Sequence, residues 1–353
     1  MTALERINLT LAHREPDRVP IYDGPWDTTI ARWHGEGLPA AQTPDEFFGY
    51  DMLRLIVDWS LLLPVESVEE TEEYLIVRNS DGGLEKNFKG RTTTPEWRDF
   101  AVKSPADWYE LKPLLTWSPQ RVDWEAARRL ARLRAERGLW FHVVIASGWD
   151  RLQSLVGTEQ LLLAMAEQPE WVQDMCDTAA DLACTILEEV AGAGIEFDCA
   201  FLLDDLGYRN GPLFSPAMFA RFEFANHRRI YQVAHSLGLW TILHSCGNMQ
   251  AHLPALIEAG LDCLQPLEVK AGMDLIELKQ RYGEVLSFMG GIDVRKMAHP
   301  DPAVIEEEIA TKLTFAKRGG GYLYHSDHTV PDNVSFEQYC RVIDLVHKYG
   351  RYG

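Results

Sequence analysis

The chain has 353 residues, of which 46% are hydrophobic and 25% charged, so it has ample material for the core of a globular protein. This length fits two domains or one α/β barrel, since such barrels often reach this size as a single domain. The formal net charge of −19 disfavours nucleic acid and anionic membrane surfaces as partners, and it disfavours a polyanionic substrate unless arginines act locally.

The N-terminal residues and the cysteines predict a cytoplasmic protein. Residues 1–20 carry charges at Glu5, Arg6 and Arg14 and contain no apolar segment, so we expect no secretory signal. No apolar run approaches the roughly 18–20 residues that span a bilayer. The six cysteines form no CxxC pair, so we expect reduced thiols. Four of them are expected in the core: Cys176, Cys184, Cys199 and Cys340.

Short apolar segments rich in β-forming residues alternate with helical patterns along the chain. In the helical pattern of residues 215–238, Ser215 is the expected N-cap and Pro216 the first helical residue. Alternation of this kind predicts a parallel sheet that is buried on both faces, and eight such strands predict one (β/α)₈ barrel over residues 1–353. The expected strands are residues 18–23, 52–58, 140–147, 199–205, 240–245, 262–268, 286–293 and 321–327.

One insertion, residues 61–104, interrupts this alternation between the second and third expected strands. Within it, "YLIVRNSDGGLEKNF" predicts a β-hairpin that turns around Asp81, Gly82 and Gly83. We expect this insertion to decorate the barrel without forming a separate domain.

Polar, mostly ionisable residues follow nearly every expected strand, where barrel enzymes assemble their active sites. Helix capping can explain Asp58 and Ser147, but histidine is not a favoured cap. We therefore predict a functional site at this rim. The residues at the strand ends are Asp23, Asp58, Ser147, Asp204, Asp205, His244, Glu268, Asp293, His325, Asp327 and His328.

His244 and Cys246 are the strongest candidates for metal binding. Residues i and i+2 of a strand point to the same face, so imidazole and thiolate can converge on one ion. This pair suits Zn²⁺, and a catalytic zinc needs a third protein ligand. The alternative is a buried thiol beside a histidine that orients a substrate. Candidates for the third ligand are His325, Asp327, His328, or the carboxylate of Asp204 or Glu268.

Further candidates would contact a substrate or move protons. Asp204 and Asp205 are adjacent on a strand, so at most one of them should face inward, and with Asp23 they are the candidate catalytic carboxylates. Glu268 and Asp293 are candidate polar contacts to the substrate. Aromatic residues after strand ends would wall a mostly apolar pocket, unless they only pack the rim: Trp26, Trp33, Trp149 and Tyr208.

Several motifs, spread in order over essentially the whole chain, resemble the uroporphyrinogen decarboxylase superfamily. They are "AHREPDRVPI", "LLDDLG", "GPLFSP", "HSCGN", "GLDCLQPLE", "SFMGGID" and "GGGYLYHSDHTVPDNVSFEQY". The resemblance implies a single (β/α)₈ barrel with its site at the carboxyl ends of the strands.

The superfamily has two branches with different chemistry. True uroporphyrinogen decarboxylases use no cofactor and hold their tetrapyrrole with arginines of an "RQAGRY"-like stretch, whereas this chain has "YDGPWDTTIARWHGEGLP" and keeps only Arg32. The other branch, zinc-dependent corrinoid-linked methyltransferases, has a His-x-Cys motif that His244 and Cys246 match. Its downstream cysteine is absent here, which implies a replacement from "YHSDHTVP", in the order His328, Asp327 and His325.

The resemblance therefore implies transfer of a methyl group from a small O-methylated compound to a corrinoid on a separate protein, with zinc acting on the leaving oxygen. One alternative is a metal-free decarboxylase of a small carboxylate, with acid/base groups from Asp23, Asp205 and His328 and with Arg32 or Arg209 holding the carboxylate. Another is a non-catalytic barrel that binds a ligand or a corrinoid protein. Since decorated barrels often dimerise, we expect a homodimer.

Overall fold

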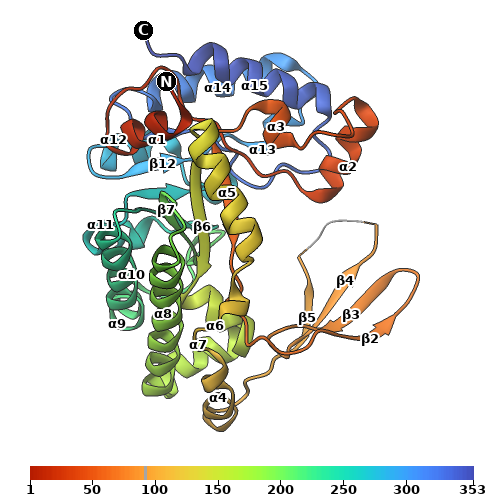
Figure 1. The fold of residues 1–353 in the computed structure, drawn as a ribbon, viewed down its shortest axis with the longest axis vertical. Coiled ribbons are helices and arrows are strands. Elements are labelled where there is room, and N and C mark those ends of the chain that lie inside the picture. The colour runs from red at the N-terminus through yellow and green to blue at the C-terminus, as the bar shows by residue number, and fades with distance from the viewer. Residues whose placement is uncertain (91–93) are drawn as a thin grey trace.

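The computed structural model describes residues 1–90 and 94–353 and shows an α/β fold around a curled parallel sheet (Figure 1). The order of the seven strands in this sheet follows the chain, and every neighbouring pair is parallel. The strands are β1 (Met52–Ile56), β6 (Trp140–Ala146), β7 (Cys199–Leu203), β10 (Trp240–His244), β11 (Cys263–Gln265), β12 (Ser287–Met289) and β13 (Tyr322–Leu323).

The first of the eight expected strands, residues 18–23, is an extended segment and not a regular strand. It nevertheless bonds to both ends of the sheet. The Tyr22 N–H donates to the carbonyl of Tyr324, just after β13, at 3.2 Å, and the Asp51 N–H, just before β1, donates to the carbonyl of Ile21 at 2.8 Å. Pro20 has no N–H to donate, so a regular ladder cannot form here.

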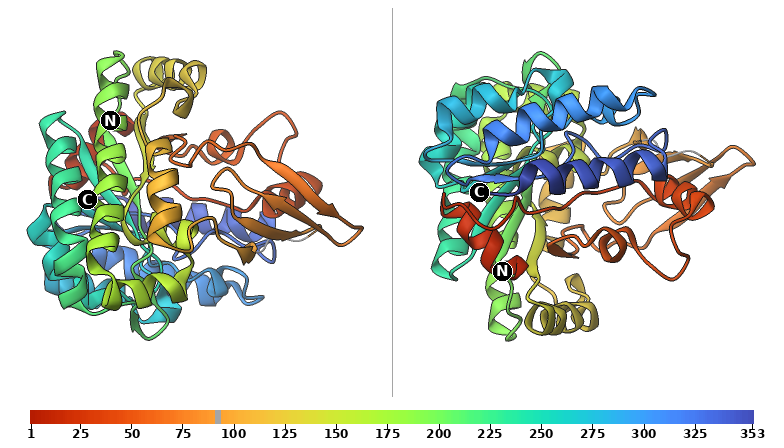
Figure 2. Two further views of the ribbon diagram at one scale, coloured as in Figure 1. Left: turned by 90° about the horizontal axis from the view of Figure 1, so that it is seen from below. Right: turned by 90° about the horizontal axis from the view of Figure 1, so that it is seen from above.

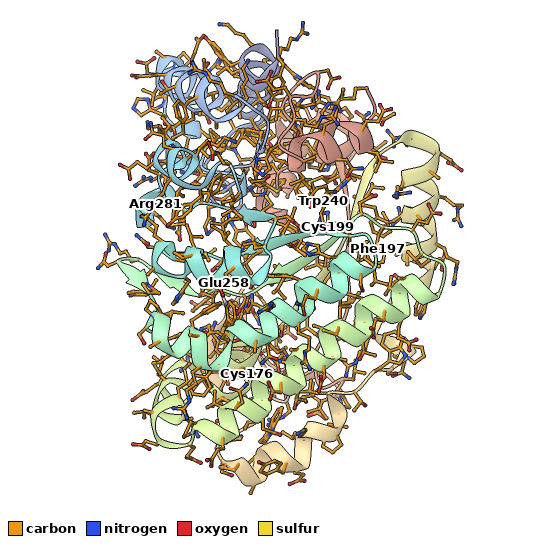
Figure 3. All side chains as sticks on the ribbon, turned by 90° about the vertical axis from the view of Figure 1, so that its left-hand side faces the viewer. Cys176, Phe197, Cys199, Trp240, Glu258 and Arg281 are labelled. Carbon is orange, nitrogen blue, oxygen red and sulfur yellow. The ribbon has the colours of Figure 1, made fainter. Side chains whose placement is uncertain are left out.

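Helices cover the outer face of the sheet, as the alternating sequence pattern predicts (Figures 1 and 2). Figure 3 shows two of the longest, α8 and α10, lying side by side, with Cys176 of α8 labelled. The helices are α1 (Ala3–Leu11), α2 (Asp27–Glu36), α3 (Pro44–Phe48), α4 (Pro105–Leu111), α5 (Trp124–Arg137), α6 (Gly148–Val156), α7 (Thr158–Glu167), α8 (Pro169–Gly192), α9 (Pro216–Phe222), α10 (Phe224–Ser236), α11 (Leu253–Ala259), α12 (Leu275–Tyr282), α13 (Val294–Met297), α14 (Pro302–Ala316) and α15 (Phe336–Gly350).

One expected helix is divided in two. The Ser215 hydroxyl accepts the Met218 N–H, and Pro216 begins α9, as predicted. The helical pattern of residues 215–238 then breaks at Glu223, where α9 ends and α10 begins in a new direction. This break places the Glu223 side chain in the protein interior, where it is 1% exposed.

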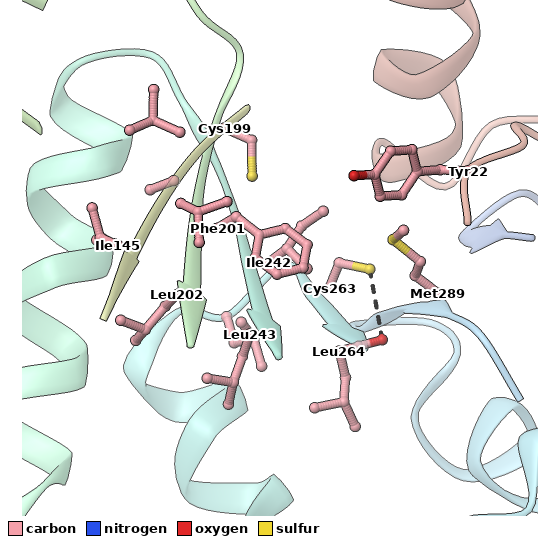
Figure 4. Close-up of a cluster of buried hydrophobic side chains, with 14 of the residues drawn as sticks. Tyr22, Ile145, Cys199, Phe201, Leu202, Ile242, Leu243, Cys263, Leu264 and Met289 are labelled. Carbon is pink, nitrogen blue, oxygen red and sulfur yellow. Dashed lines mark hydrogen bonds between the residues drawn. The ribbon is translucent and has the colours of Figure 1, made fainter. Parts of the chain in front are cut away.

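Side chains of the parallel strands alternate between two buried environments. In Figure 4, Phe201 of β7 points toward the side from which Tyr22 approaches, whereas its neighbour Leu202 points toward the covering helices. Cys199 and Cys263 begin their strands and are fully buried, so both thiols belong to the core, as was expected for Cys199. Toward the carboxyl ends of the strands, the inward-facing residues line a cavity.

The insertion forms a four-stranded antiparallel sheet that stands apart from the main body in Figure 1. The predicted hairpin is present, since β3 and β4 pair with Arg78 opposite Leu84. Asp81 in its turn bonds to the guanidinium of Arg151 in α6 at 2.8 Å and joins this sheet to the main body. The strands are β2 (Glu66–Glu70), β3 (Tyr74–Arg78), β4 (Leu84–Phe88) and β5 (Glu96–Asp99), and a separate ribbon pairs β8 (Gly207–Tyr208) with β9 (Gly211–Pro212).

None of the helices in the described part of the chain combines the length and the apolar character needed to cross a membrane.

Candidate functional site

A cavity of about 340 Å³ lies at the carboxyl ends of the parallel strands. A larger cavity of about 550 Å³ lies on the outer side, along α4 and α8, but no histidine or cysteine is among its described lining residues. The smaller cavity is therefore the candidate functional site. Its walls are Tyr22, Gly24, Trp26, Arg54, Ile56, Thr94, His142, Val144, Phe201, Leu203, His244, Cys246, Gln265, Pro266, His325, His328 and Thr329.

Three potential metal ligands lie within 4.8 Å of one another: Asp205, His244 and Cys246. His244 and Cys246 line this cavity, and Asp205 lies beside them outside the lining. Nε2 of His244 lies 3.5 Å from Sγ of Cys246 and 3.6 Å from Oδ1 of Asp205. His244 ends β10, while Asp205 follows β7, the strand next to it in the sheet. The Cys246 N–H donates to Oδ1 of Asp205 at 2.7 Å, which fixes the carboxylate beside the other two ligands.

These separations fit a tetrahedral zinc ion. With Zn–N and Zn–O bonds of about 2.0–2.1 Å and a Zn–S bond of about 2.3 Å, ligand atoms lie roughly 3.3–3.6 Å apart. Gln265 also selects the required tautomer of His244, because its Oε1 accepts a hydrogen bond from Nδ1. Nε2 is then left with a free lone pair that faces Asp205 and Cys246.

The turn after β10 explains why "HSCGN" has this sequence. Gly247 has φ +77°, and a Cβ there would lie 2.4 Å from the backbone carbon of Gly207, so only glycine fits. Its N–H donates to Oε2 of Glu268 at 2.7 Å. Burial, reinforced by the charges of Asp205 and Glu268, raises the pKa of the Cys246 thiol well above its ordinary value.

The structure brings Asp205 to His244 and Cys246, a different residue from the third ligands expected from the sequence. Asp327 accepts the N–H groups of Val269 at 3.0 Å and Val294 at 2.9 Å, so its carboxylate holds two loops and does not line the cavity. His325 and His328 both line the cavity, yet neither belongs to a cluster of three potential ligands among the described residues. The carboxylate that lies beside His244 and Cys246 is that of Asp205, which was predicted to be catalytic.

Asp204 faces the opposite way and belongs to a second cluster, with Glu223 and His227. All three are buried, and Oδ2 of Asp204 lies 2.7 Å from Nε2 of His227. Burial raises the pKa of Asp204 well above its ordinary value, raises that of Glu223 to about 8 and lowers that of His227 to about 4. This cluster therefore favours neutral groups, and none of its members lines the cavity, so the position of Asp204 gives no support to its predicted catalytic role.

Asp23, the third predicted catalytic carboxylate, is also absent from the cavity wall. Its oxygens accept hydrogen bonds from Tyr339 at 2.9 Å, from Tyr324 at 3.2 Å and from the hydroxyl of Ser326. This buried carboxylate ties the 18–23 segment to the chain after β13.

Of the four aromatic residues that were predicted to line the pocket, Trp26 lines the cavity, and its ring lies 6.4 Å from that of His328. Trp33 is fully buried and donates to the carbonyl of Val334, while Trp149 packs on Phe214. Tyr208 is 65% exposed on the β8–β9 ribbon. The last three do not line the cavity: Trp33 lies in α2, Trp149 in α6 and Tyr208 in β8.

The two predicted polar contacts to the substrate have structural partners instead. Glu268 bonds to the N–H of Gly247 and to Lys270, and Asp293 caps α13 and pairs with Arg295 at 2.6 Å. Neither lines the cavity.

Among the cavity residues absent from the predicted site are Arg54, His142 and Gln265. Arg54 and His142 lie within their strands, and Gln265 ends β11, whereas the prediction placed the end of that strand three residues later, at Glu268. The available signal was a charged or polar residue inside an apolar segment.

Comparison with known proteins finds a matching family model and curated relatives. The family model described as "Uroporphyrinogen decarboxylase (URO-D)" matches residues 76–349. Uroporphyrinogen decarboxylases of Pectobacterium carotovorum and Citrobacter koseri are 28% identical over 99 residues and 30% identical over 96 residues. These matches cover 28% and 27% of this chain, and the chain spans about a quarter of the relatives' length, 27% and 26%.

One solved structure, a methyltransferase from Methanosarcina mazei, aligns with 99% of both chains at a TM-score of 0.69. The sequence identity is 16%, so this likeness shows the shared fold.

Proposed function

The chain belongs to the uroporphyrinogen decarboxylase family, and we propose that it is a zinc-dependent methyltransferase within it. It would move a methyl group between a small O-methylated compound and a corrinoid on a separate protein. The observation that carries this proposal is the group of Asp205, His244 and Cys246, whose ligand atoms all lie within 4.8 Å of one another. In this proposal the curled sheet is a (β/α)₈ barrel, with residues 18–23 in the eighth strand position.

The ligand set suits the activation of an oxygen atom. One nitrogen, one sulfur and one oxygen ligand leave a fourth tetrahedral position open, as catalytic zinc sites require. Bound there, Zn²⁺ would supply a Lewis acid that polarises the ether or hydroxyl oxygen of the substrate. Gln265 holds the His244 imidazole, and Asp205 is held by the N–H of Cys246, so these side chains are oriented before metal binds.

The transfer would break the O–CH₃ bond and pass the methyl group to the corrinoid. As the methyl acceptor, a cobalt(I) corrinoid would supply the electron pair for the new bond, and the leaving oxygen would keep the old pair and take up a proton from solvent. The chain's own contribution is to hold the small substrate against apolar walls, among them Trp26, Phe201 and Leu203, away from bulk water.

A metal-free decarboxylase is the second candidate, favoured by family membership and by a cationic residue, Arg54, in the cavity wall. The residues predicted for this chemistry fit poorly. Asp23 is occupied by buried hydroxyl donors, and Arg32 is bound to Glu36 and to the carbonyl of Asp332.

A single-turnover assay tests the proposal. Zinc-loaded protein is mixed with methoxylated aromatic compounds and free cob(I)alamin, and formation of methylcobalamin is followed by its absorption spectrum. We expect methyl transfer by the wild type and by Cys340→Ala, a half-buried cysteine in α15, but not by Cys246→Ala. Equal transfer by Cys246→Ala would contradict the proposal, and release of CO₂ from carboxylated compounds without methyl transfer would favour the decarboxylase.

A further inference from the structure

We infer that the cavity contains an anion subsite, formed by Arg54 and His142, which binds a carboxylate on the small substrate. The substrate class is then a small aromatic or similarly flat carboxylic acid. The subsite stands on its own geometry, while the placement of the substrate's methoxy group at His244 rests on the proposed function.

Arg54 and His142 are neighbours in the middle of two adjacent strands. In the pairing of β1 with β6, Arg54 lies directly opposite His142, and both side chains line the cavity. Among the described lining residues, Arg54 is the only lysine or arginine. Arg54 is exposed, so its charge stays hydrated and is accessible to an anionic ligand.

Within the described residues, neither side chain has a hydrogen-bond or ion-pair partner. The guanidinium of Arg54 forms no ion pair or hydrogen bond with any described residue and is accessible from the cavity. His142 is 1% exposed, and its Nδ1 has no hydrogen-bond partner within the described residues. Because Nδ1 is buried, a ligand would have to reach the ring through Nε2, and the ring lines the cavity.

The His142 ring is held in place and stays neutral. It packs against Phe201 and Tyr22, with ring centroids 5.1 and 5.6 Å away. Burial, with the charge of Arg54 second, lowers the pKa of His142 to about 3. A neutral imidazole can donate one hydrogen bond to a carboxylate, and the guanidinium can donate two in parallel.

The other titratable groups near the subsite do not neutralise the charge of Arg54, so one anionic group can bind there. Asp45 is near enough for Arg54 to influence its pKa, but the two form no ion pair within 4.0 Å among the described residues. Burial, the largest cause, lowers the pKa of His325, which favours its neutral form. The net charge of −19 disfavours substrates with many carboxylates, so a substrate with a single carboxylate fits best.

The cavity connects this subsite to the candidate metal ligands. Tyr22 lies between His142 and His325, 5.6 and 6.0 Å from their rings, and Gln265 bonds to both His325 and His244. Since Arg54 and His142 lie mid-strand and His244 ends its strand, a carboxylate held deep in the cavity leaves the opposite end of the substrate at the rim.

The test compares an acid with its neutral analogue by calorimetry. The probes are 4-methoxybenzoate and 4-methoxybenzamide, which have nearly the same shape. We expect wild-type protein to bind the acid about 10- to 100-fold more tightly, because the charge-assisted hydrogen bonds form only with the acid. Arg54→Met should remove this preference, and Arg54→Lys, which keeps the charge, should retain part of it. His142→Phe should reduce it by less than Arg54→Met does.

Arg32→Met is the matched control, since Arg32 is the exposed arginine that the sequence pattern offered as a carboxylate ligand. It should keep the full preference for the acid. Equal binding of the two probes by wild type, no binding of the acid at millimolar concentration, or an unchanged preference in Arg54→Met would overturn the subsite. Zinc content is measured on the same samples: a zinc-free wild type that still prefers the acid would refute the proposed function and leave the subsite standing.

Discussion

Asp204 and Asp205 are adjacent in sequence but begin two clusters with opposite properties. Asp205 joins His244 and Cys246 at the cavity, where the carboxylate side chain is 36% and the imidazole 28% exposed. Asp204 joins Glu223 and His227 in the interior, where its side chain is 0% and that of His227 1% exposed. The alternation of side chains along an extended segment separates the two clusters, since neighbouring residues point to opposite faces.

The comparison teaches that burial, more than residue type, decides what such a cluster can do. In the interior cluster, burial shifts the pKa of both carboxyl groups upward and that of the histidine downward, so every group tends toward its neutral form. Metal ligands must be deprotonated, and a catalytic ion needs an open position. The cavity cluster offers access and a histidine with a free lone pair, and its Cys246 thiol, whose pKa burial also raises, must lose its proton when metal binds.

The largest expected effect is a loss of stability when the histidine of the interior cluster is replaced by alanine, compared with the same change in the cavity cluster. His227→Ala leaves Asp204 without its buried partner and opens a cavity, so we expect a loss of about 3–5 kcal/mol in the free energy of unfolding. His244→Ala removes a partly exposed side chain at a cavity wall and should cost less than about 1 kcal/mol. Urea denaturation of both variants measures the difference, and equal losses would contradict the contrast between the clusters.

The pH dependence of stability should be traced to the interior cluster. The pKa of Glu223 is raised from its ordinary 4.5 to about 8, so the folded state keeps a proton that the unfolded state releases. Its contribution to stability is therefore complete below about pH 4.5 and is lost as the pH rises through about 8. Glu223→Gln, which stays neutral, should remove a decline of roughly 5 kcal/mol between these limits.

Denaturation at several pH values measures this effect, with Glu170→Gln on the exposed start of α8 as the control. If Glu223→Gln and the wild type lose stability in parallel as the pH rises, Glu223 does not hold the proton.

A smaller effect is expected from the groups that orient the two histidines. Gln265 accepts from Nδ1 of His244, and the Tyr231 hydroxyl bonds to Nδ1 of His227 at 2.9 Å. Gln265→Leu should weaken zinc binding by about 10- to 100-fold, because His244 is no longer fixed in the ligating tautomer. Tyr231→Phe should leave zinc affinity unchanged and lower only stability. Competition with a fluorescent zinc chelator gives both affinities, and a matching loss in Tyr231→Phe would argue against two independent clusters.

The parts of the site that follow from local geometry could be predicted from sequence. His244 and Cys246 sit two residues apart at the end of an apolar segment, and strand periodicity alone places them on one face. The hairpin around Asp81 and the cap at Ser215 follow from equally local turn and capping preferences.

The features of the site that the sequence did not predict depend on tertiary contacts. Nothing in "YHSDHTVP" shows that the Asp327 carboxylate binds two backbone amides of other loops. The helix break at Glu223 lies inside a continuous helical pattern, so the interior cluster had no sequence signal. Arg54 and His142 did have one, as polar residues inside the apolar segments "MLRLIVD" and "WFHVVIAS". Because the predicted site residues were taken only from the ends of the expected strands, Arg54 and His142 were not among them.

The most direct measurement is the zinc content of purified protein by mass spectrometry, after zinc loading and removal of free metal. Wild type, His227→Gln and Cys340→Ala should hold about one zinc per chain, and Cys246→Ala and Asp205→Ala should hold little or none. A zinc-free wild type, or zinc that persists in Cys246→Ala and disappears in His227→Gln, would contradict the assignment of the metal site to Asp205, His244 and Cys246.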